Sequence, residues 1–183
     1  ITAQGYTRAQ LQGLLDKALI TCIREPLTAG EGWSGALLAE PALPLNREQS
    51  AALAALHEGL DRFHPCLLHG VTGSGKTEIY LQLIEGVLGQ GRQALVLVPE
   101  IGLTPQTLSR FRKRFRAPVV ALHSGLTDLE RLDAWEAARS GCAPIIIGTR
   151  SAIFTPLAAP GLIIVDEAHT CAFDGSTKGG RQL

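Results

Sequence analysis

Short apolar runs alternate with amphipathic helical patterns along the chain from residue 45 onward. The runs are apolar at nearly every position instead of every second one, which is typical of strands buried on both faces of a sheet. Repeated strand–helix–strand order predicts an α/β domain whose parallel sheet is covered by helices. Five such runs occur: Cys66–His69, Ala94–Val98, Pro118–Leu122, Pro144–Ile147 and Leu162–Val165.

The helical patterns between these runs begin with recognisable capping signals. Thr104 and Pro105 supply an N-cap and a proline for the first helical turn. Thr127 and Glu130 form a capping box, in which each side chain can accept a hydrogen bond from the other residue's backbone. Two further helices are expected at Ser50–Leu60 and Thr77–Leu88, the second with one apolar face: Ile79, Leu83, Ile84, Val87 and Leu88.

The first 44 residues follow a different pattern. Thr7 and Gln10 form a capping box, apolar positions then recur at helical spacing as far as Leu19, and Ile20–Arg24 is interpreted as a short strand. Residues 26–44 are rich in Gly, Pro, Ala and Glu and are expected to be a linker. One helix and one strand cannot bury their apolar faces alone, so residues 1–25 are expected to be part of a small domain.

Composition narrows the classes of protein that fit. Hydrophobic residues make up 45% of the 183, enough for a packed core. Seventeen Lys and Arg balance seventeen Asp and Glu, which excludes a uniformly basic nucleic-acid binder but leaves a local basic patch open. No apolar run approaches the roughly 18–20 residues that span a bilayer, so no membrane association is expected.

Two further features concern the origin of the chain and its compartment. The chain has no Met and begins at Ile1, so we expect either that a start Met was removed or that this is an internal piece of a longer protein. Four well-separated cysteines disfavour both paired-cysteine zinc spacing and a dense disulfide framework, and indicate reduced thiols in a cytosolic protein: Cys22, Cys66, Cys142 and Cys171.

The strongest motif is a phosphate-binding loop (P-loop) of the form G-x-x-x-x-G-K-[ST]. The glycines allow backbone N–H groups to turn toward a β-phosphate, Lys76 places a cation on the β and γ oxygens, and the Thr77 hydroxyl can ligate Mg²⁺. A glycine-rich turn without a ligand is the alternative. The motif comprises Gly70, Val71, Thr72, Gly73, Ser74, Gly75, Lys76 and Thr77.

Two acidic residues follow the last apolar run. In a sheet that carries a P-loop, an acid at the carboxyl end of a strand can reach the bound metal. Asp166 is therefore the candidate Mg²⁺ ligand, and Glu167 the candidate general base that orients and deprotonates the attacking water. A polar turn after a strand is the alternative interpretation.

Together with this P-loop, D-E-A-H at residues 166–169 resembles motif II of superfamily 2 helicases. Four ordered blocks narrow the resemblance to the PriA (primosomal protein N′) family of replication-restart DNA helicases. They are GVTGSGKTEIY at Gly70–Tyr80, VPEIGLTPQ at Val98–Gln106, LHSG at Leu122–Gly125 and GTRSAIF at Gly148–Phe154. The second and fourth blocks disfavour a P-loop kinase or a transporter ATPase.

This resemblance implies that residues 45–169 form a first RecA-like helicase lobe. Such a lobe hydrolyses ATP with Mg²⁺ and moves along single-stranded DNA with 3′→5′ polarity in the bacterial cytoplasm. The implied partners are single-stranded and forked DNA, primosome proteins and replication-restart proteins. The resemblance further implies that residues 1–25 are the remnant of a winged-helix domain. Zinc is expected in the full-length family, but not in this segment.

The resemblance also implies residue roles outside the P-loop. Gln49 would bond the adenine edge, where a helix N-cap at Asn46 followed by a solvated turn is the alternative. Two loops would contact the DNA backbone through amides, hydroxyls and one Arg, and ordinary capped loops are the alternative. The candidate contacts are Thr104, Gln106, Thr149 and Arg150.

One basic concentration, at residues 110–116, has five cations in seven residues. It would attract a nucleic-acid backbone with salt-dependent affinity, and a solvated helix face is the alternative. Phe111 and Phe115 lie four residues apart within it, so on a helix they share a face and are expected to pack on the sheet and not to stack on bases.

Three departures from the family pattern shape the expectations. Ala168 stands where the family usually has Glu, although this position is neither metal ligand nor base. Residues 170–183 are polar and Gly-rich, and a disordered or non-family tail is expected there. The second lobe with its arginine finger does not follow, so the isolated chain is expected to be inactive or nearly so. A nucleotide- or DNA-binding module without catalysis and a non-functional truncation product are the alternatives.

Overall fold

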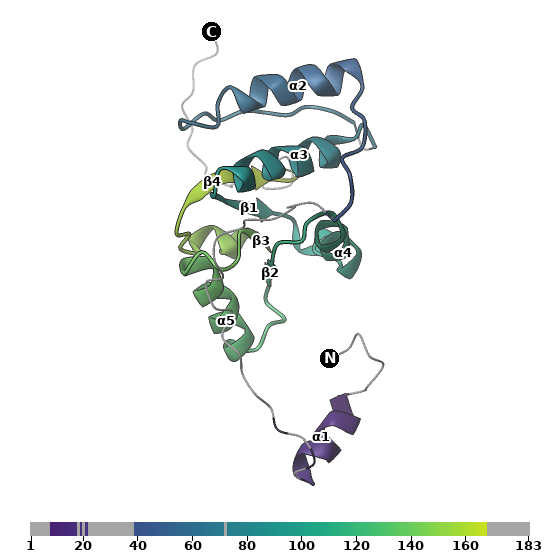
Figure 1. Ribbon diagram of the computed structural model, residues 1–183, viewed down its shortest axis with the longest axis vertical. Coiled ribbons are helices and arrows are strands. Elements are labelled where there is room, and N and C mark those ends of the chain that lie inside the picture. Colours follow the sequence, from purple (N-terminus) through teal and green to yellow (C-terminus); the bar gives the residue numbers. More distant parts are fainter. Residues whose placement is uncertain (1–7, 18, 20, 22–38, 72, 168–183) are drawn as a thin grey trace, which may run out of the picture.

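The computed structural model describes residues 8–17, 19, 21, 39–71 and 73–167, and every structural statement below concerns those residues. Four parallel strands form one sheet in the order β2-β3-β1-β4 (Figure 1). The strands are β1 Gln93–Leu97, β2 Val119–Leu122, β3 Ile145–Gly148 and β4 Pro160–Val165. The helices are α1 Arg8–Asp16, α2 Arg47–His57, α3 Lys76–Gly89, α4 Pro105–Arg114 and α5 Asp128–Arg139, with short 3₁₀ turns η2 Glu100–Gly102 and η3 Arg150–Phe154.

Helices cover both faces of the sheet, which confirms the predicted α/β class. On one face α3 and α4 pack against Val96, Ile147 and neighbouring strand residues, and on the other α5 and η3 pack against Leu95 and Ile146. Strands β1 and β3 are buried at every position, as their unbroken apolar sequences predict. β4 differs, because alternate residues on it are half exposed.

A second helical layer lies outside α3. Leu53 and Leu56 of α2 pack against Ile79, Leu83 and Val87 of α3. The two helices approach closely at Gly86, where an added Cβ would lie 2.6 Å from His57 Cε1. Figure 1 shows α2 above α3, with the chain 58–71 returning between them to the start of α3. This layer places the start of α2 beside the P-loop.

The predicted strand Cys66–His69 is wrong. None of its residues pairs with a strand in the described chain, and Leu67 is 82% exposed. Leu68 packs instead among helix side chains, against the cluster that contains Leu60 and Ile79. A short apolar run predicts burial, but a strand also needs a neighbouring strand to pair its N–H and C=O groups. The P-loop therefore follows an extended, largely exposed segment.

The capping signals predicted for α4 and α5 are confirmed, whereas Thr7 of the predicted Thr7–Gln10 capping box lies outside the described residues. Thr104 accepts a hydrogen bond from Thr107 N at 3.1 Å and caps α4, with Pro105 in the first turn. Thr127 and Glu130 form both hydrogen bonds of a capping box at the start of α5. Within the described chain, no helix combines the length and the apolar character needed to cross a membrane.

The N-terminal expectations are tested only in part. α1 confirms the predicted helix, although it ends at Asp16 while the apolar pattern continues to Leu19. Figure 1 places α1 apart from the sheet. The predicted strand at 20–24, most of the linker and the tail at 170–183 lie outside the described residues. The division into a winged-helix remnant, a linker and a tail stays a prediction.

Candidate nucleotide site

The P-loop reverses the chain through two glycines with left-handed backbone. Gly73 has φ +80° and Gly75 has φ +84°, a conformation that side chains with a Cβ rarely adopt. Gly75 is also the N-cap of α3, and no side chain caps this helix end. The positive end of the α3 dipole therefore opens onto the loop, as an anion-binding site requires. Thr72 lies outside the described residues.

Lys76 is directed into the loop. Its ammonium donates hydrogen bonds to the backbone oxygens of Gly70 at 2.6 Å and Val71 at 2.9 Å. An ammonium has three N–H donors, so it can hold the loop and still donate to an incoming oxygen. A Cβ at Gly70 would lie 2.7 Å from Ser74 Oγ, which shows how closely the loop folds on itself. The glycine-rich turn thus has the shape and the cation of a phosphate cradle.

Gln49 joins the start of α2 to this loop. Its backbone N–H and its Oε1 form a capping box with Asn46, at 2.8 Å and 2.9 Å, and its Nε2 donates to Ser74 O at 2.9 Å. The N-cap interpretation of Asn46 is therefore confirmed, and it coexists with a contact to the P-loop. The amide retains one N–H and one oxygen lone pair. Those are the groups that a bidentate contact to an adenine edge uses.

The two candidate acids follow β4 directly. Asp166 N donates to Leu97 O at 2.8 Å, which continues the β1–β4 ladder by one residue. Asp166 is half-buried and Oδ1 accepts from Glu167 N at 3.1 Å. Glu167 is exposed and has φ +50°, a left-handed conformation that is uncommon outside glycine. The turn thus leaves Asp166 half-buried and Glu167 exposed.

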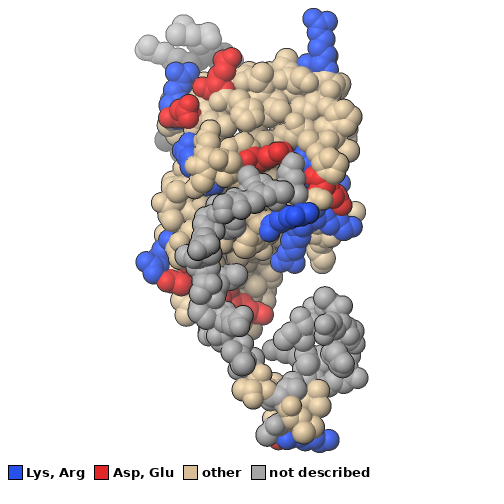
Figure 2. All heavy atoms as spheres, viewed as in Figure 1, with Lys and Arg blue, Asp and Glu red and all other residues tan. Residues whose placement is uncertain are grey.

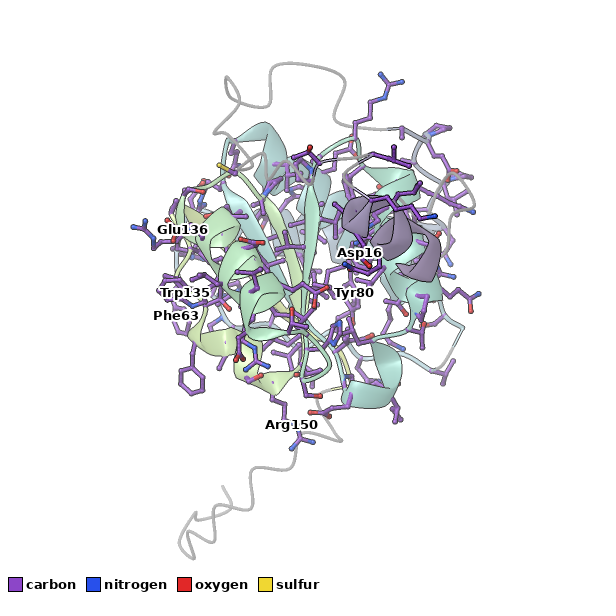
Figure 3. All side chains as sticks on the ribbon, turned by 90° about the horizontal axis from the view of Figure 1, so that it is seen from below. Asp16, Phe63, Tyr80, Trp135, Glu136 and Arg150 are labelled. Carbon is purple, nitrogen blue, oxygen red and sulfur yellow. The ribbon has the colours of Figure 1, made fainter. Side chains whose placement is uncertain are left out.

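Tyr80 connects the acids to the P-loop helix. It lies one turn after Lys76 on α3, and its pKa is raised by burial and, to a smaller extent, by the charge of Asp166. Figure 3 shows the Tyr80 side chain near the centre of the molecule. The charge of Asp166, at the end of β4, therefore acts on a residue of the helix that the P-loop opens.

The loops that follow the other strands lie at the same edge of the sheet, because all four strands are parallel. Thr104, Gln106 and Arg150 are exposed, and Arg150 projects from the body of the domain (Figure 3). Thr149 is only 7% exposed, and its backbone N–H donates to Leu122 O at 3.1 Å. Three of the four candidate nucleic-acid contacts are thus open to solvent. The fourth, Thr149, is buried and links the start of η3 to the end of β2 through its backbone hydrogen bond.

The sequence matches the DEAD/DEAH box helicase family over residues 46–180. The chain belongs to the DEAD/DEAH box helicase family. The sheet of this family member is the RecA-like α/β arrangement that the motifs predicted, and D-E-A-H follows β4.

Comparison with individual proteins shows which members of the family this chain is similar to. Replication restart protein PriA of Haemophilus influenzae is 56% identical over 137 residues, 74% of this chain and 18% of that protein. PriA of a Synechocystis strain is 58% identical over 114 residues, which are 62% of this chain and 14% of that protein. PriA of Bacillus subtilis is 50% identical over 133 residues, which are 72% of this chain and 16% of that protein. These similarities confirm the predicted resemblance to PriA, and the chain spans less than a fifth of each relative.

The basic run at residues 110–116, at the end of α4, contains both buried and exposed residues. Phe111 and Phe115 are 3% and 2% exposed and pack in the core beside the sheet, as predicted. Arg110, Arg112 and Lys113 are exposed, and Figure 2 shows Lys and Arg side chains gathered over α4. Arg114 was expected to share that exposed basic character, and it is buried.

Sequence reasoning missed three residues around the site. Tyr80 stands four positions after Lys76, so helical spacing alone could have placed both on one side of α3. Glu78 and Arg114 lie 36 residues apart and form an ion pair at 3.3 Å. No local pattern marks that pair, because only the packing of α4 against α3 brings the two side chains together.

Proposed function

We propose that this chain is the ATP-binding lobe of a replication-restart DNA helicase of the PriA type. The observation that carries the proposal is the placement of the P-loop at the start of α3 and of Asp166 and Glu167 at the carboxyl end of β4. The charge of Asp166 also acts on Tyr80 of α3. A phosphate cradle and an acid pair on one sheet edge are the two halves of a nucleotide hydrolysis site.

The residues present fit ATP and Mg²⁺. The uncapped N-terminus of α3, the loop amides and Lys76 would hold the β- and γ-phosphates. The Thr77 hydroxyl and the Asp166 carboxylate are hard oxygen ligands of the kind that Mg²⁺ prefers. When bound, Mg²⁺ would neutralise charge on the phosphate oxygens.

Two further side chains have roles in this proposal. Glu167, exposed and held at a turn, would accept the proton of the attacking water as general base. Gln49, already bonded to Ser74 of the loop, would use its remaining N–H and lone pair on the adenine edge. The nucleotide would then lie between the start of α2 and the start of α3.

DNA binding belongs to the same proposal. Exposed Thr104, Gln106 and Arg150 would contact the backbone of single-stranded DNA, and buried Thr149 would position the loop that carries Arg150. We propose 3′→5′ translocation, forked DNA as substrate, primosome and replication-restart proteins as partners, and the bacterial cytoplasm as compartment, because of the likeness to PriA.

Turnover by this chain alone is expected to be low. In motors of this kind a second lobe supplies an arginine finger, which contributes about 10³–10⁵ in rate. The proposal therefore separates two properties: this chain binds nucleotide, and a protein of the length of the PriA relatives hydrolyses it in response to DNA.

Titration of this chain with labelled ATP and Mg²⁺ tests the binding half of the proposal. We expect saturable binding that Lys76→Ala weakens about tenfold to hundredfold, because a charge-assisted hydrogen bond to phosphate is lost. Lys17→Ala, at an exposed lysine just after α1, is the matched control and should bind as the unchanged chain does. No saturation at millimolar nucleotide, or equal binding by Lys76→Ala, would contradict the nucleotide site.

A further inference from the structure

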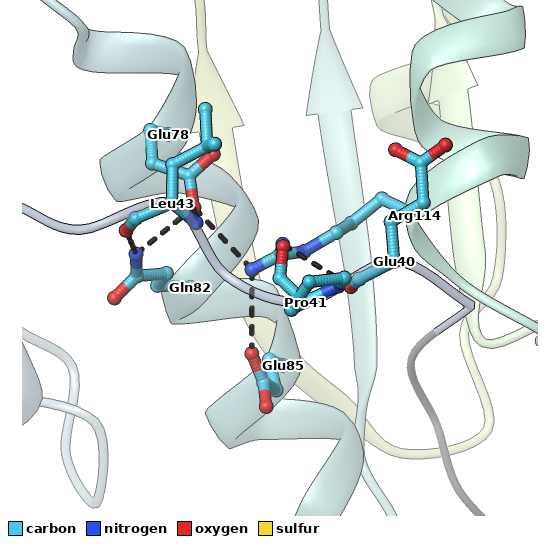
Figure 4. Close-up of polar contacts among 7 residues, drawn as sticks. All are labelled: Glu40, Pro41, Leu43, Glu78, Gln82, Glu85 and Arg114. Atoms are coloured by element: carbon cyan, nitrogen blue, oxygen red, sulfur yellow. Dashed lines mark hydrogen bonds and ion pairs between the residues drawn. The ribbon is translucent and has the colours of Figure 1, made fainter.

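Arg114, the last residue of α4, is buried at the junction of α3, α4 and the segment 39–46. Its side chain is 5% exposed, and Nη2 lies 3.3 Å from Glu78 Oε1 and 3.7 Å from Glu85 Oε2 (Figure 4). Nη1 donates to the carbonyl of Glu40 at 3.3 Å and to that of Pro41. One guanidinium thus binds helix α3 with one nitrogen and the segment 39–46 with the other.

Glu78 extends this contact along the segment. Its Oε1 accepts the backbone N–H of Leu43 at 3.1 Å, in addition to Arg114, and Gln82 Nε2 donates to Leu43 O at 3.0 Å. Ala39 N donates to the Arg114 carbonyl at 2.9 Å. Both backbone groups of Leu43 and the carbonyls of two earlier residues are therefore bound to side chains of α3 and α4.

This anchored segment leads directly to Gln49. Only two residues separate Leu43 from Asn46, which caps α2 and binds Gln49 through both hydrogen bonds of the capping box. Glu78 itself follows Thr77 of the P-loop in the first turn of α3. The same helical turn thus carries the phosphate cradle on one side and the anchor of the Gln49 segment on the other.

We propose that Arg114 and Glu78 are positioning residues that set the selectivity of the nucleotide site for adenine. They fix the segment 39–46 on α3, and thereby fix Gln49 at the distance from the P-loop at which its amide meets the base. Gln49 presents an acceptor and a donor, which match N6–H and N7 of adenine, whereas guanine has an acceptor, O6, in place of the N6 donor. The inference rests on the proposed nucleotide site and goes beyond it.

The arrangement predicts a selective defect. The proposed phosphate contacts come from the P-loop and the start of α3. The apolar residues of α3 pack on the sheet, so binding of the triphosphate should persist when the anchor is removed. Gln49 would lose its fixed position, and a misplaced hydrogen bond changes affinity about threefold to tenfold. The loss should therefore fall on the preference for ATP over GTP and leave the affinity for GTP unchanged.

The test is titration of this chain, without DNA, with labelled ATP and labelled GTP. We expect Arg114→Ala to lower the ATP-to-GTP affinity ratio about threefold to tenfold, with GTP affinity held within about twofold. Arg114→Lys should restore part of the thermal stability and little of the ratio, because one ammonium cannot bridge α3 and the carbonyls of segment 39–46 as a planar guanidinium does. Arg139→Ala, which removes an exposed ion pair with Glu136, is the matched control and should keep the ratio.

Glu78→Gln provides a second variant if Arg114→Ala does not fold. It keeps an acceptor for Leu43 N and removes the charge that pairs with Arg114. A ratio lowered by this variant supports the inference as well.

Three results would overturn the inference, and they differ. A folded Arg114→Ala or Glu78→Gln chain with a lower melting temperature and an unchanged ratio would show a purely structural role. A ratio unaffected by Gln49→Ala would remove the adenine assignment on which the inference depends. Absence of any ATP binding by the unchanged chain would refute the proposed nucleotide site itself.

Discussion

At the residue scale, what a side chain does around the candidate site depends on its neighbours in the fold as well as on its amino-acid type. Gln49 is a capping residue and a P-loop contact at once, because its amide offers two donors and an acceptor. The position of Lys76 in the loop could be predicted from sequence, since its spacing relative to the loop glycines is set by the loop itself. The metal-ligand role of Thr77 stays a prediction. Arg114 could not, because burial of an Arg in a basic run depends on Glu78 and Glu85, which belong to another helix.

Tyr80 gives a residue-scale prediction about pH. Burial and the Asp166 charge raise its pKa above the ordinary value of about 10. The neutral phenol therefore stabilises the fold fully below about pH 10, and this contribution is lost as pH rises through the raised pKa of the folded state. In Asp166→Asn the pKa of Tyr80 should fall but stay above its ordinary value, since burial remains.

Tyrosinate absorbance during an alkaline titration measures this shift. Tyr6 is the other tyrosine, so a Tyr6→Phe background isolates Tyr80. The unchanged Asp166 chain in that background is the control. An identical Tyr80 pKa with and without the Asp166 carboxylate would show that α3 and the end of β4 do not meet as described.

At the element scale, sequence signals that are local predicted the structure well. Thr104 and the Thr127–Glu130 pair mark helix starts because a capping hydrogen bond involves residues three positions apart. The expected strand at 66–69 failed because strand formation needs a partner strand elsewhere in the chain. Exposure on β4 is also set by the fold: its sequence is apolar throughout, but it is an edge strand of the described sheet, and Ile163 and Val165 are 50% and 43% exposed.

Helix α4 gives an element-scale prediction about DNA. Gln106, Arg110 and Lys113 recur at spacings of four and three, so they share one exposed face of the helix. The Phe111 face is buried in the core. If contacts to the DNA backbone at Gln106 continue along this face, Arg110 and Lys113 should each contact a phosphate. Replacing both with Ala should then make the negative slope of log affinity against log salt about 1.4 less steep for single-stranded DNA.

Replacing Arg112 and Arg116 with Ala is the matched control for this measurement. Both residues are exposed and carry the same total charge as the first pair; Arg112 lies on another face of α4, and Arg116 follows the end of the helix. Binding measured over a salt series distinguishes the two double variants. Equal slopes for both would assign the basic run to a solvated surface without a nucleic-acid path.

At the scale of the whole molecule, the parallel sheet explains why separate motifs act together. The acid pair and the candidate DNA loops are far apart in sequence, and the parallel strands bring the loops after β1, β2, β3 and β4 to one edge. The P-loop, which follows none of these strands, is placed by the start of α3. Sequence analysis could assign the edge from the parallel direction of the strands, but interactions across it, such as the effect of the Asp166 charge on Tyr80, depend on how α3 packs on the sheet.

The central claim is that Asp166 and Glu167, at the carboxyl end of β4, act with the P-loop as a hydrolytic centre in a DNA-dependent motor. The most direct measurement is DNA-stimulated ATP hydrolysis by a protein of the length of the PriA relatives that carries this segment. Glu167→Gln should keep nucleotide binding and lose about 10²–10⁴ in hydrolysis rate, because the amide cannot accept the proton of the attacking water. Hydrolysis at the unchanged rate in Glu167→Gln, with DNA and saturating ATP, would contradict the account.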